Sequence, residues 1–497
     1  MLELALALAI VTQDQIPLRG APHENAPRHA TLAHGDQLEV RGVRGEYLQV
    51  YDYRRERAGY IRATQASRYA LTPEEAPRLK AVVDFLTEQP GYEALGIGHT
   101  AAFIAAAPAE QIDAQTFVAL GTMADRLAAR ASRLSGATSG TNAERARIVT
   151  GHLEVAAHYG VRTRSVEKNE KITLCYDGEA WRRVLALPAT PEQKARAALA
   201  LTRHECVDPL LSPGERLQTD LWRAELLDQA LASGNGKETL PAHLKDRLEI
   251  RAAGIWAGIA HQRARQTKPD PAAILAAGQN AETHLLRVDK KALVDGDLAA
   301  WNEAAIRVGA SRWAAVPLDA PAPVKGRPSI RLVAGEPGQT CIQIIEGQAD
   351  AKAPAAATST ATASTAFTPQ CTYGQVWPAS LTVSPDGKFM TLAVQPLETW
   401  RELWLFHKEG ATWQVEAIPP ATENPELGYI EFAGWVPGNK QFLAARETVV
   451  EGRGKTSFEL WSRVTLSAEK RADKPGNLTP FYRWQDPAWK GGTIAIR

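Results

Sequence analysis

The spacing of the apolar residues changes after about seventy positions, and this change limits the chain to folds that combine strands with helices. In the first part, apolar and polar residues alternate, as at Leu38 and Val40, which predicts half-buried β-strands. In the next part, Leu79, Val83 and Leu86 recur at the spacing of one helix face. The chain has 497 residues, a length that predicts three or four domains. The predicted fold class is therefore multidomain α+β.

The first domain is predicted at residues 11–69, where short apolar segments alternate with turn residues. Its segments include Leu18-Arg19-Gly20-Ala21-Pro22, Gly35-Asp36-Gln37-Leu38-Glu39-Val40, Tyr47-Leu48-Gln49-Val50 and Gly59-Tyr60-Ile61. This order resembles the bacterial SH3-like (SH3b) domain, whose pattern runs L-R-x-x-P, G-x-x-L-x-V, W/Y-x-x-V and G-Y/W-V/I. The resemblance implies a small β-barrel that closes on itself. It also implies a binding module, often at the cell wall.

The second domain is predicted at residues 72–315 as an α-helical array. It opens with Thr72-Pro73, a helix cap followed by a first-turn proline, and short breakers such as Pro90-Gly91 separate its helices. Antiparallel helix pairs stacked in a row fit this pattern, and without a fixed repeat length they form an irregular α-solenoid. Asp177-Gly178 interrupts the array between two apolar runs, which predicts either a hairpin or a tight helix-entry turn.

The third domain is predicted at residues 327–497 and is rich in β-strands. Eight of the thirteen tryptophans lie beyond residue 371, and the segment repeats itself, because Ser384–Val394 is echoed by Trp435–Ala445. The S-P-D-G-K turn of the first copy resembles TolB/WD-type propeller repeats. Two full copies are too few to close a propeller, so we expect a partial propeller or an antiparallel sandwich.

The four cysteines fall into two sequence-local pairs, and we expect the disulfides Cys175–Cys206 and Cys341–Cys371. Disulfides indicate an oxidising compartment, so the protein is predicted to be periplasmic or secreted. The alternative is four buried thiols in a cytosolic protein. The second pair encloses a segment made almost wholly of Ala, Thr, Ser and Pro, which predicts a disordered insert at residues 347–370.

The first ten residues have two interpretations. They are apolar but about half as long as a membrane-spanning helix, and small residues at Ala7 and Ala9 are spaced like a cleavage site. Residues 1–10 are therefore interpreted as the remnant of an export signal. The alternative is the first β-strand of the barrel.

Composition and motifs exclude several classes of function. Lys plus Arg (57) and Asp plus Glu (56) nearly cancel, so we expect no nucleic-acid binding, and no segment predicts an integral membrane helix. His204-Glu205-Cys206 lacks a second ligand cluster, and Gly96-Ile97-Gly98 follows no strand, which favours a glycine-rich helix junction. No catalytic residue, metal site or cofactor is predicted.

The candidate binding residues lie in the first domain. Aromatic rings beside guanidinium groups suit a sugar-peptide or an acidic peptide ligand. The residues concerned are Tyr47, Tyr51, Tyr53, Arg54, Arg55 and Tyr60. In the alternative interpretation, Tyr47 and Tyr60 are core residues and the arginines form a solvated hairpin tip.

These expectations favour a non-enzymatic binding or scaffold protein of the cell envelope, with peptidoglycan or an envelope partner protein as ligand. The alternative is an envelope (peptidoglycan) hydrolase whose site lies in the helical region, since a pair of catalytic carboxylates leaves no sequence signature. The whole-chain pattern also resembles an uncharacterised family of exported proteobacterial proteins, which adds nothing about function. Oligomeric state is left open.

Overall fold

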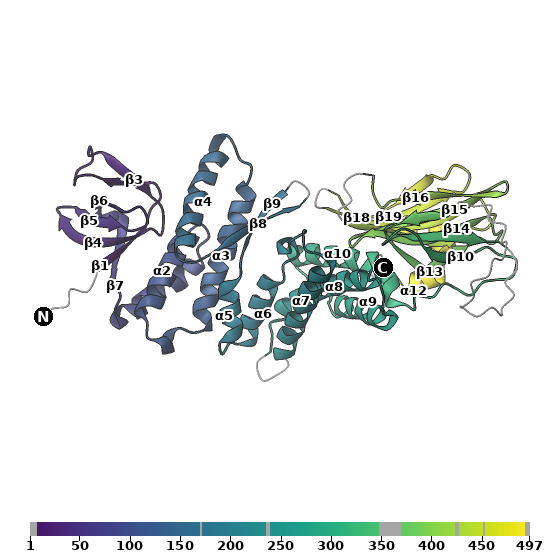
Figure 1. Ribbon diagram of the computed structural model, residues 1–497, viewed down its shortest axis with the longest axis horizontal. Helices are drawn as coiled ribbons and strands as arrows, with labels where there is room; N and C mark the ends of the chain where they lie inside the picture. Colours follow the sequence, from purple (N-terminus) through teal and green to yellow (C-terminus); the bar gives the residue numbers. More distant parts are fainter. Residues whose placement is uncertain are drawn as a thin grey trace. The chain divides into compact units, whose positions relative to one another are not determined.

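A computed structural model of the chain shows a mixed α+β protein with several antiparallel sheets and an array of helices (Figure 1). It describes residues 7–168, 171–234, 239–346, 369–422, 427–450 and 453–492. Two compact units are present: Met1–Leu211 with Gln229–Leu244, and Ser212–Asp228 with Lys245–Arg497. The division falls inside the predicted helical array of residues 72–315.

The first unit begins with a seven-stranded antiparallel sheet in the order β3-β2-β6-β5-β4-β1-β7. The strands are β1 (Ala7–Val11), β2 (Ile16–Arg19), β3 (Arg28–Leu32), β4 (Gln37–Arg44), β5 (Tyr47–Asp52), β6 (Arg57–Arg62) and β7 (Ala66–Ala70). The expected closure into a barrel is not found among the described residues, since closure requires the two end strands to pair, and here β3 and β7 do not.

Strand β1 explains the apolar character of the first residues. It pairs with both β4 and β7, and because side chains alternate between the two faces of a strand, both of its faces are used. Ala9 and Val11 point into the core of the sheet, while Leu8 and Ile10 pack with the helices that follow. Residues 7–10 thus take the strand alternative of the sequence analysis; residues 1–6 lie outside the described part.

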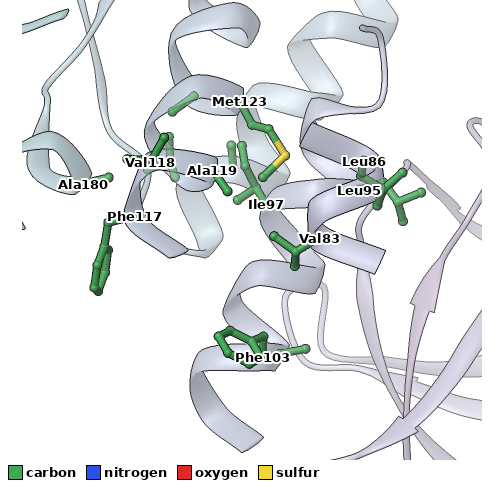
Figure 2. Packing of buried hydrophobic residues seen from close by; sticks show 14 of the residues in the cluster. Val83, Leu86, Leu95, Ile97, Phe103, Phe117, Val118, Ala119, Met123 and Ala180 are labelled. Atoms are coloured by element: carbon green, nitrogen blue, oxygen red, sulfur yellow. The ribbon is translucent and has the colours of Figure 1, made fainter. Parts of the chain in front are cut away.

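Six helices and a hairpin complete this unit. They are α1 (Ala76–Thr87), α2 (Glu93–Ala106), α3 (Ala114–Leu134), α4 (Gly140–His158), β8 (Thr163–Lys168), β9 (Lys171–Tyr176), α5 (Glu179–Ala186) and α6 (Pro191–Leu201). Figure 2 shows the apolar side chains of α1, α2 and α3 gathered in one core, among them Val83, Ile97 and Met123. Gly96 allows the close approach of α2 to α3, because a Cβ atom there would collide with the sulfur of Met123. Gly96 and Gly98 lie inside α2, so the glycine-rich segment belongs to one helix and is not the predicted helix junction.

The Asp177-Gly178 turn is a helix entry, as one of the two sequence alternatives stated. Gly178 is the N-cap of α5 and has φ +85°, a conformation that favours glycine. The Cys175–Cys206 disulfide is present and joins β9 to the short helix His204–Cys206 just after α6.

The second unit combines two sheets with four long helices, apart from the helical residues within 229–244, which belong to the first unit. The helices are α7 (Pro213–Ser233), α8 (Ala242–Ala264), α9 (Pro271–Leu286) and α10 (Asp295–Ala310), with two short helices, α11 (Thr479–Trp484) and α12 (Pro487–Gly492), near the end. The smaller sheet holds β10 (Ser329–Ala334), β11 (Thr340–Ile345) and β12 (Gln370–Thr372). The larger sheet holds β13 (Gln375–Val383), β14 (Phe389–Leu397), β15 (Trp400–Glu409), β16 (Thr412–Ile418), β17 (Gly428–Trp435), β18 (Gln441–Val450), β19 (Arg453–Ser462) and β20 (Ala468–Ala472).

The sequence repeat corresponds to two antiparallel four-stranded meanders, β13–β16 and β17–β20. In each meander the repeated turn joins the first two strands, and Gly387 and Gly438 in these turns have positive φ. A short parallel pairing of β15 with β17 joins the meanders into one sheet. No propeller is found among the described residues, because blades of a propeller are separate sheets around an axis.

The smaller sheet packs against the first meander, with Ile342 and Ile344 in one core with Val376 and Met390. The Cys341–Cys371 disulfide links β11 to β12, so both predicted disulfides are confirmed. Paired cysteines fit an oxidising, extracytoplasmic setting. Residues 347–368 of the predicted disordered insert lie outside the described part, and Gln370, placed in that insert by the sequence analysis, instead begins β12.

A buried ion pair joins helices to the larger sheet in the second unit. Arg401 in β15 is fully buried and pairs with Glu431 in β17. Glu431 also accepts hydrogen bonds from Arg312 at 3.1 Å and from the Trp489 indole at 3.0 Å.

In the described part of the chain, no helix has both the length and the apolar character needed to cross a lipid bilayer.

Candidate functional site

The tyrosines predicted to bind a ligand lie on β5 and β6 of the N-terminal sheet. Tyr47 and Tyr51 share one face of β5, and the register places Tyr60 of β6 between them on that face. The opposite face carries Leu48 and Val50, which belong to the core of the sheet. Three of the predicted tyrosines are therefore on the outward face, because alternate residues of a strand point in opposite directions.

Tyr53 extends this surface at the end of β5. It is 60% exposed, and its ring stands edge-on to that of Tyr51 with 4.9 Å between centroids. The Arg41 guanidinium lies 4.1 Å from the centre of the Tyr51 ring and 2.9 Å from Glu39. Hydrogen bonds from Arg41 and from the Tyr53 hydroxyl, the latter at 2.8 Å, lower the pKa of Glu39. This carboxylate consequently stays charged to a lower pH than an unpaired glutamate does.

The opposite end of the same face carries Tyr47 and Arg62. The Arg62 guanidinium lies 5.8 Å from the centre of the Tyr47 ring and pairs with Glu24 and Glu46. Tyr47 is only 8% exposed, whereas Tyr60 is partly exposed. We name the surface formed by Tyr47, Tyr51, Tyr53 and Tyr60 with Arg41 and Arg62 the tyrosine face.

The two arginines that the sequence analysis placed with these tyrosines have other partners. Arg55 binds Asp52 at 2.7 Å and Asp36 at 3.0 Å, and both carboxylates are buried. Arg54 lies 3.1 Å from Asp36 and 3.4 Å from Glu154 on α4. Arg54 and Arg55 thus hold the hairpin to its surroundings, which differs from both the ligand contact and the solvated tip considered for them.

A second polar cluster lies where the sheet meets α4. Asp14 from the turn after β1, His34 from the loop after β3 and His152 from α4 place one ligand-type atom each within 4.8 Å of one another. His152 Nε2 donates to Asp14 Oδ1 at 2.7 Å, and the His34 amide donates to the same oxygen at 3.1 Å. His152 is 2% exposed and His34 is 9% exposed.

Arginine and backbone contacts fix which ring nitrogens carry protons. Arg130 Nη2 donates to His152 Nδ1 at 2.6 Å, so the proton of neutral His152 is on Nε2. His34 Nε2 donates to the Thr12 carbonyl at 2.5 Å, which leaves a lone pair on Nδ1. Burial lowers the pKa of His34 although Asp14 opposes this effect. Burial alone would raise the pKa of Asp14, but the hydrogen bonds from His152 and from the His34 amide lower it.

Sequence reasoning missed both the arginines of the tyrosine face and the Asp14–His34–His152 cluster. The neighbours of Tyr47 and Tyr51 follow from strand register, and a β5–β6 hairpin pairs Tyr47 with Arg62, so a register prediction could have found Arg62. The cluster leaves no such signal. Its members come from three separate elements, and the one that completes it lies 118 residues beyond His34 on a helix.

The chain matches no protein-family model, no curated protein and no solved structure.

Proposed function

We propose that this is a non-enzymatic binding or scaffold protein of the bacterial cell envelope, periplasmic or secreted, whose N-terminal sheet is an SH3-like module for peptidoglycan. The observation that carries the proposal is the tyrosine face, above all the exposed Tyr53 standing edge-on to Tyr51 beside the Arg41 guanidinium. Exposed aromatic rings with polar groups at their edges bind sugar rings by stacking and hydrogen bonding. The two disulfides support the location.

The charges of the tyrosine face favour a glycan polymer over an acidic peptide. Arg41 is paired with Glu39, and Arg62 with Glu24 and Glu46, so each guanidinium is already balanced by a carboxylate. A surface that recognises an acidic peptide needs unbalanced positive charge to attract it. Stacking on tyrosine rings does not, because it depends on exposed apolar area.

The remainder of the chain fits a scaffold. A helical array and a broad sheet present extended surfaces on which partner proteins can be held. The C-terminal repeat adds a second such surface built from two similar meanders.

The experiment is sedimentation of the purified full chain with insoluble peptidoglycan. We expect the wild type to pellet with the polymer and the double variant Tyr51→Ala, Tyr53→Ala to bind at least about tenfold more weakly, which corresponds to about 1.4 kcal/mol. Tyr482→Ala is the matched control, because Tyr482 is 72% exposed but lies on α11 in the other unit. Binding should also persist at high salt, since it does not rest on net charge.

Equal retention of the wild type and the double variant would contradict the proposal. The same incubation is analysed for released fragments. New reducing ends or free amines would instead support the envelope-hydrolase alternative.

A further inference from the structure

The His34 ring presents a lone pair that no described residue uses. Its Nε2 donates to the Thr12 carbonyl, so Nδ1 is an acceptor, and this atom is buried without a hydrogen-bond partner among the described residues. Asp14 Oδ2 lies 3.7 Å from this atom. A buried acceptor without a donor costs free energy, and such groups in native proteins call for a ligand, a water or an ion.

We propose that Asp14, His34 and His152 bind a divalent zinc-type cation. The donor set is two imidazole nitrogens and one carboxylate oxygen, which suits zinc and related first-row metals rather than calcium or magnesium. The site is separate from the tyrosine face and does not depend on the function proposed for it. Three protein ligands leave one coordination position, and Asp14, whose side chain is 27% exposed, gives solvent access to it.

Two donor-atom spacings lie within about 0.6 Å of those in a tetrahedral zinc site, and all three donor atoms lie within 4.8 Å of one another. Bonds of about 2.0–2.1 Å in a tetrahedral zinc site separate neighbouring ligand atoms by about 3.3 Å. Here His152 Nε2 and Asp14 Oδ1 are closer, at 2.7 Å, while His34 Nδ1 and Asp14 Oδ2 are 3.7 Å apart. The His34 ring is already held in the required tautomer by a backbone carbonyl, as ligating histidines are in known metal sites.

Arg130 opposes metal binding and sets its affinity. Coordination through His152 Nε2 requires the proton of that nitrogen to move to Nδ1, the atom to which Arg130 now donates. The Arg130 guanidinium would then have to release Nδ1, although it is held by the Gly91 carbonyl at 2.9 Å and by Glu93 at 3.0 Å. Replacing Arg130 by glutamine supplies an acceptor for Nδ1–H, and we therefore expect Arg130→Gln to bind zinc about tenfold more tightly.

The test is calorimetric titration of the chelator-stripped full chain with Zn²⁺, with the bound metal counted by elemental analysis. We expect one Zn²⁺ in the wild type and binding at least about 100-fold weaker in His34→Gln. His158→Gln is the matched control, because His158 is exposed on the same helix and should leave the affinity unchanged. Absence of zinc binding by the wild type, equal affinity in His34→Gln, or weaker binding by a folded Arg130→Gln would overturn the assignment.

A second measurement on the wild type does not rely on any variant folding. Zn²⁺ should slow amide hydrogen exchange in the turn that holds Asp14 and in α4 around His152. Zinc binding that leaves exchange in both segments unchanged would place the metal elsewhere and overturn the proposal.

Discussion

Asp14 accepts a hydrogen bond from His152 Nε2 at 2.7 Å, and this bond joins the first turn of the N-terminal sheet to helix α4. The two elements are connected at other points too, since the Tyr159 hydroxyl donates to the Gly35 carbonyl at 2.8 Å and Arg54 lies 3.4 Å from Glu154. These three contacts between the sheet and α4 are polar. A polar contact of this kind is sensitive to single substitutions and to pH.

Removal of the Asp14 carboxylate should loosen α4. In Asp14→Ala the almost fully buried His152 ring loses its acceptor, which costs about 1–3 kcal/mol. We expect the amides of α4 to exchange about 5- to 150-fold faster in metal-free buffer, measured by hydrogen–deuterium exchange with mass spectrometry. Glu88→Gln, at an exposed position after α1, should change nothing. Unaltered exchange in α4 would show that the bond does not hold the helix.

The same contact should weaken as the pH falls. The pKa of His34 is lowered below its usual 6.5, chiefly by burial, so just below pH 6.5 the unfolded chain binds a proton that the folded chain does not. The free energy of unfolding therefore decreases as the pH falls through this window. The lowered pKa of Asp14 adds stability that is present above its usual 3.8 and is lost only at lower pH.

The measurement is the exchange rate of α4 amides between pH 7.5 and 5, corrected for intrinsic exchange and with chelator present. His34→Gln removes the titrating group and should flatten the profile relative to the wild type. His99 on α2 also has a pKa lowered by burial and so affects stability in the same direction. The profile of His99→Gln is therefore compared with that of His34→Gln, to separate the contributions of the two histidines. Identical pH profiles in the wild type and His34→Gln would exclude the role of His34.

Features carried by local sequence could be predicted, because short-range pattern determines them. The disulfide pairs and the turn of the C-terminal repeat were predicted, and the turn at Gly178 was predicted as either a hairpin or a helix entry. Strand β1 was a true ambiguity, since a strand buried on both faces has the same continuous apolar composition as an export signal.

Features that depend on distant residues could not be predicted. Whether the N-terminal strands close and how the two C-terminal meanders join are decided by pairings between non-adjacent strands, such as β15 with β17. The partners of Arg54 and Arg55 are of this kind too, because Asp36 is brought to them by folding of the sheet. The candidate cation site is the extreme case, with three ligands on three elements.

The two disulfides should differ in their reactivity toward reductant. Each pair has one buried member, Cys175 or Cys341, but Cys206 is only partly exposed whereas Cys371 is exposed on β12. Thiol–disulfide exchange requires access to a sulfur atom. Under native conditions we therefore expect dithiothreitol to reduce Cys341–Cys371 first, as read by alkylation and peptide mass mapping. Simultaneous reduction of both pairs would contradict this order unless it accompanied unfolding.

Loss of the Cys175–Cys206 disulfide should lower the free energy of unfolding. Cys175 and Cys206 enclose a sequence separation of 31 residues, for which the chain-entropy model gives about 3–4 kcal/mol. The double variant Cys175→Ser, Cys206→Ser should release the β8–β9 hairpin from the helix end and increase exchange there. The reference is Cys341→Ser, Cys371→Ser, which removes a loop of nearly the same length, 30 residues, in the other unit and should leave that hairpin unchanged.

The ion pair of Arg401 and Glu431 is expected to be important for the stability of the second unit. Glu431→Ala would leave the fully buried Arg401 guanidinium without its counter-charge and would also remove the acceptor used by Arg312 and Trp489. Removing one partner of a buried pair costs about 3–5 kcal/mol, far more than the pair itself contributes relative to apolar residues.

Urea denaturation followed by tryptophan fluorescence should show this loss, because the second unit contains twelve of the thirteen tryptophans, every one except Trp181. Glu416→Gln on the exposed side of β16 should leave the transition unchanged. Unfolding of Glu431→Ala and Glu416→Gln at the same urea concentration would contradict this prediction. It would mean that Arg401 contacts solvent or another anion in the variant, and that the buried pair does not hold the short C-terminal helices to the sheet.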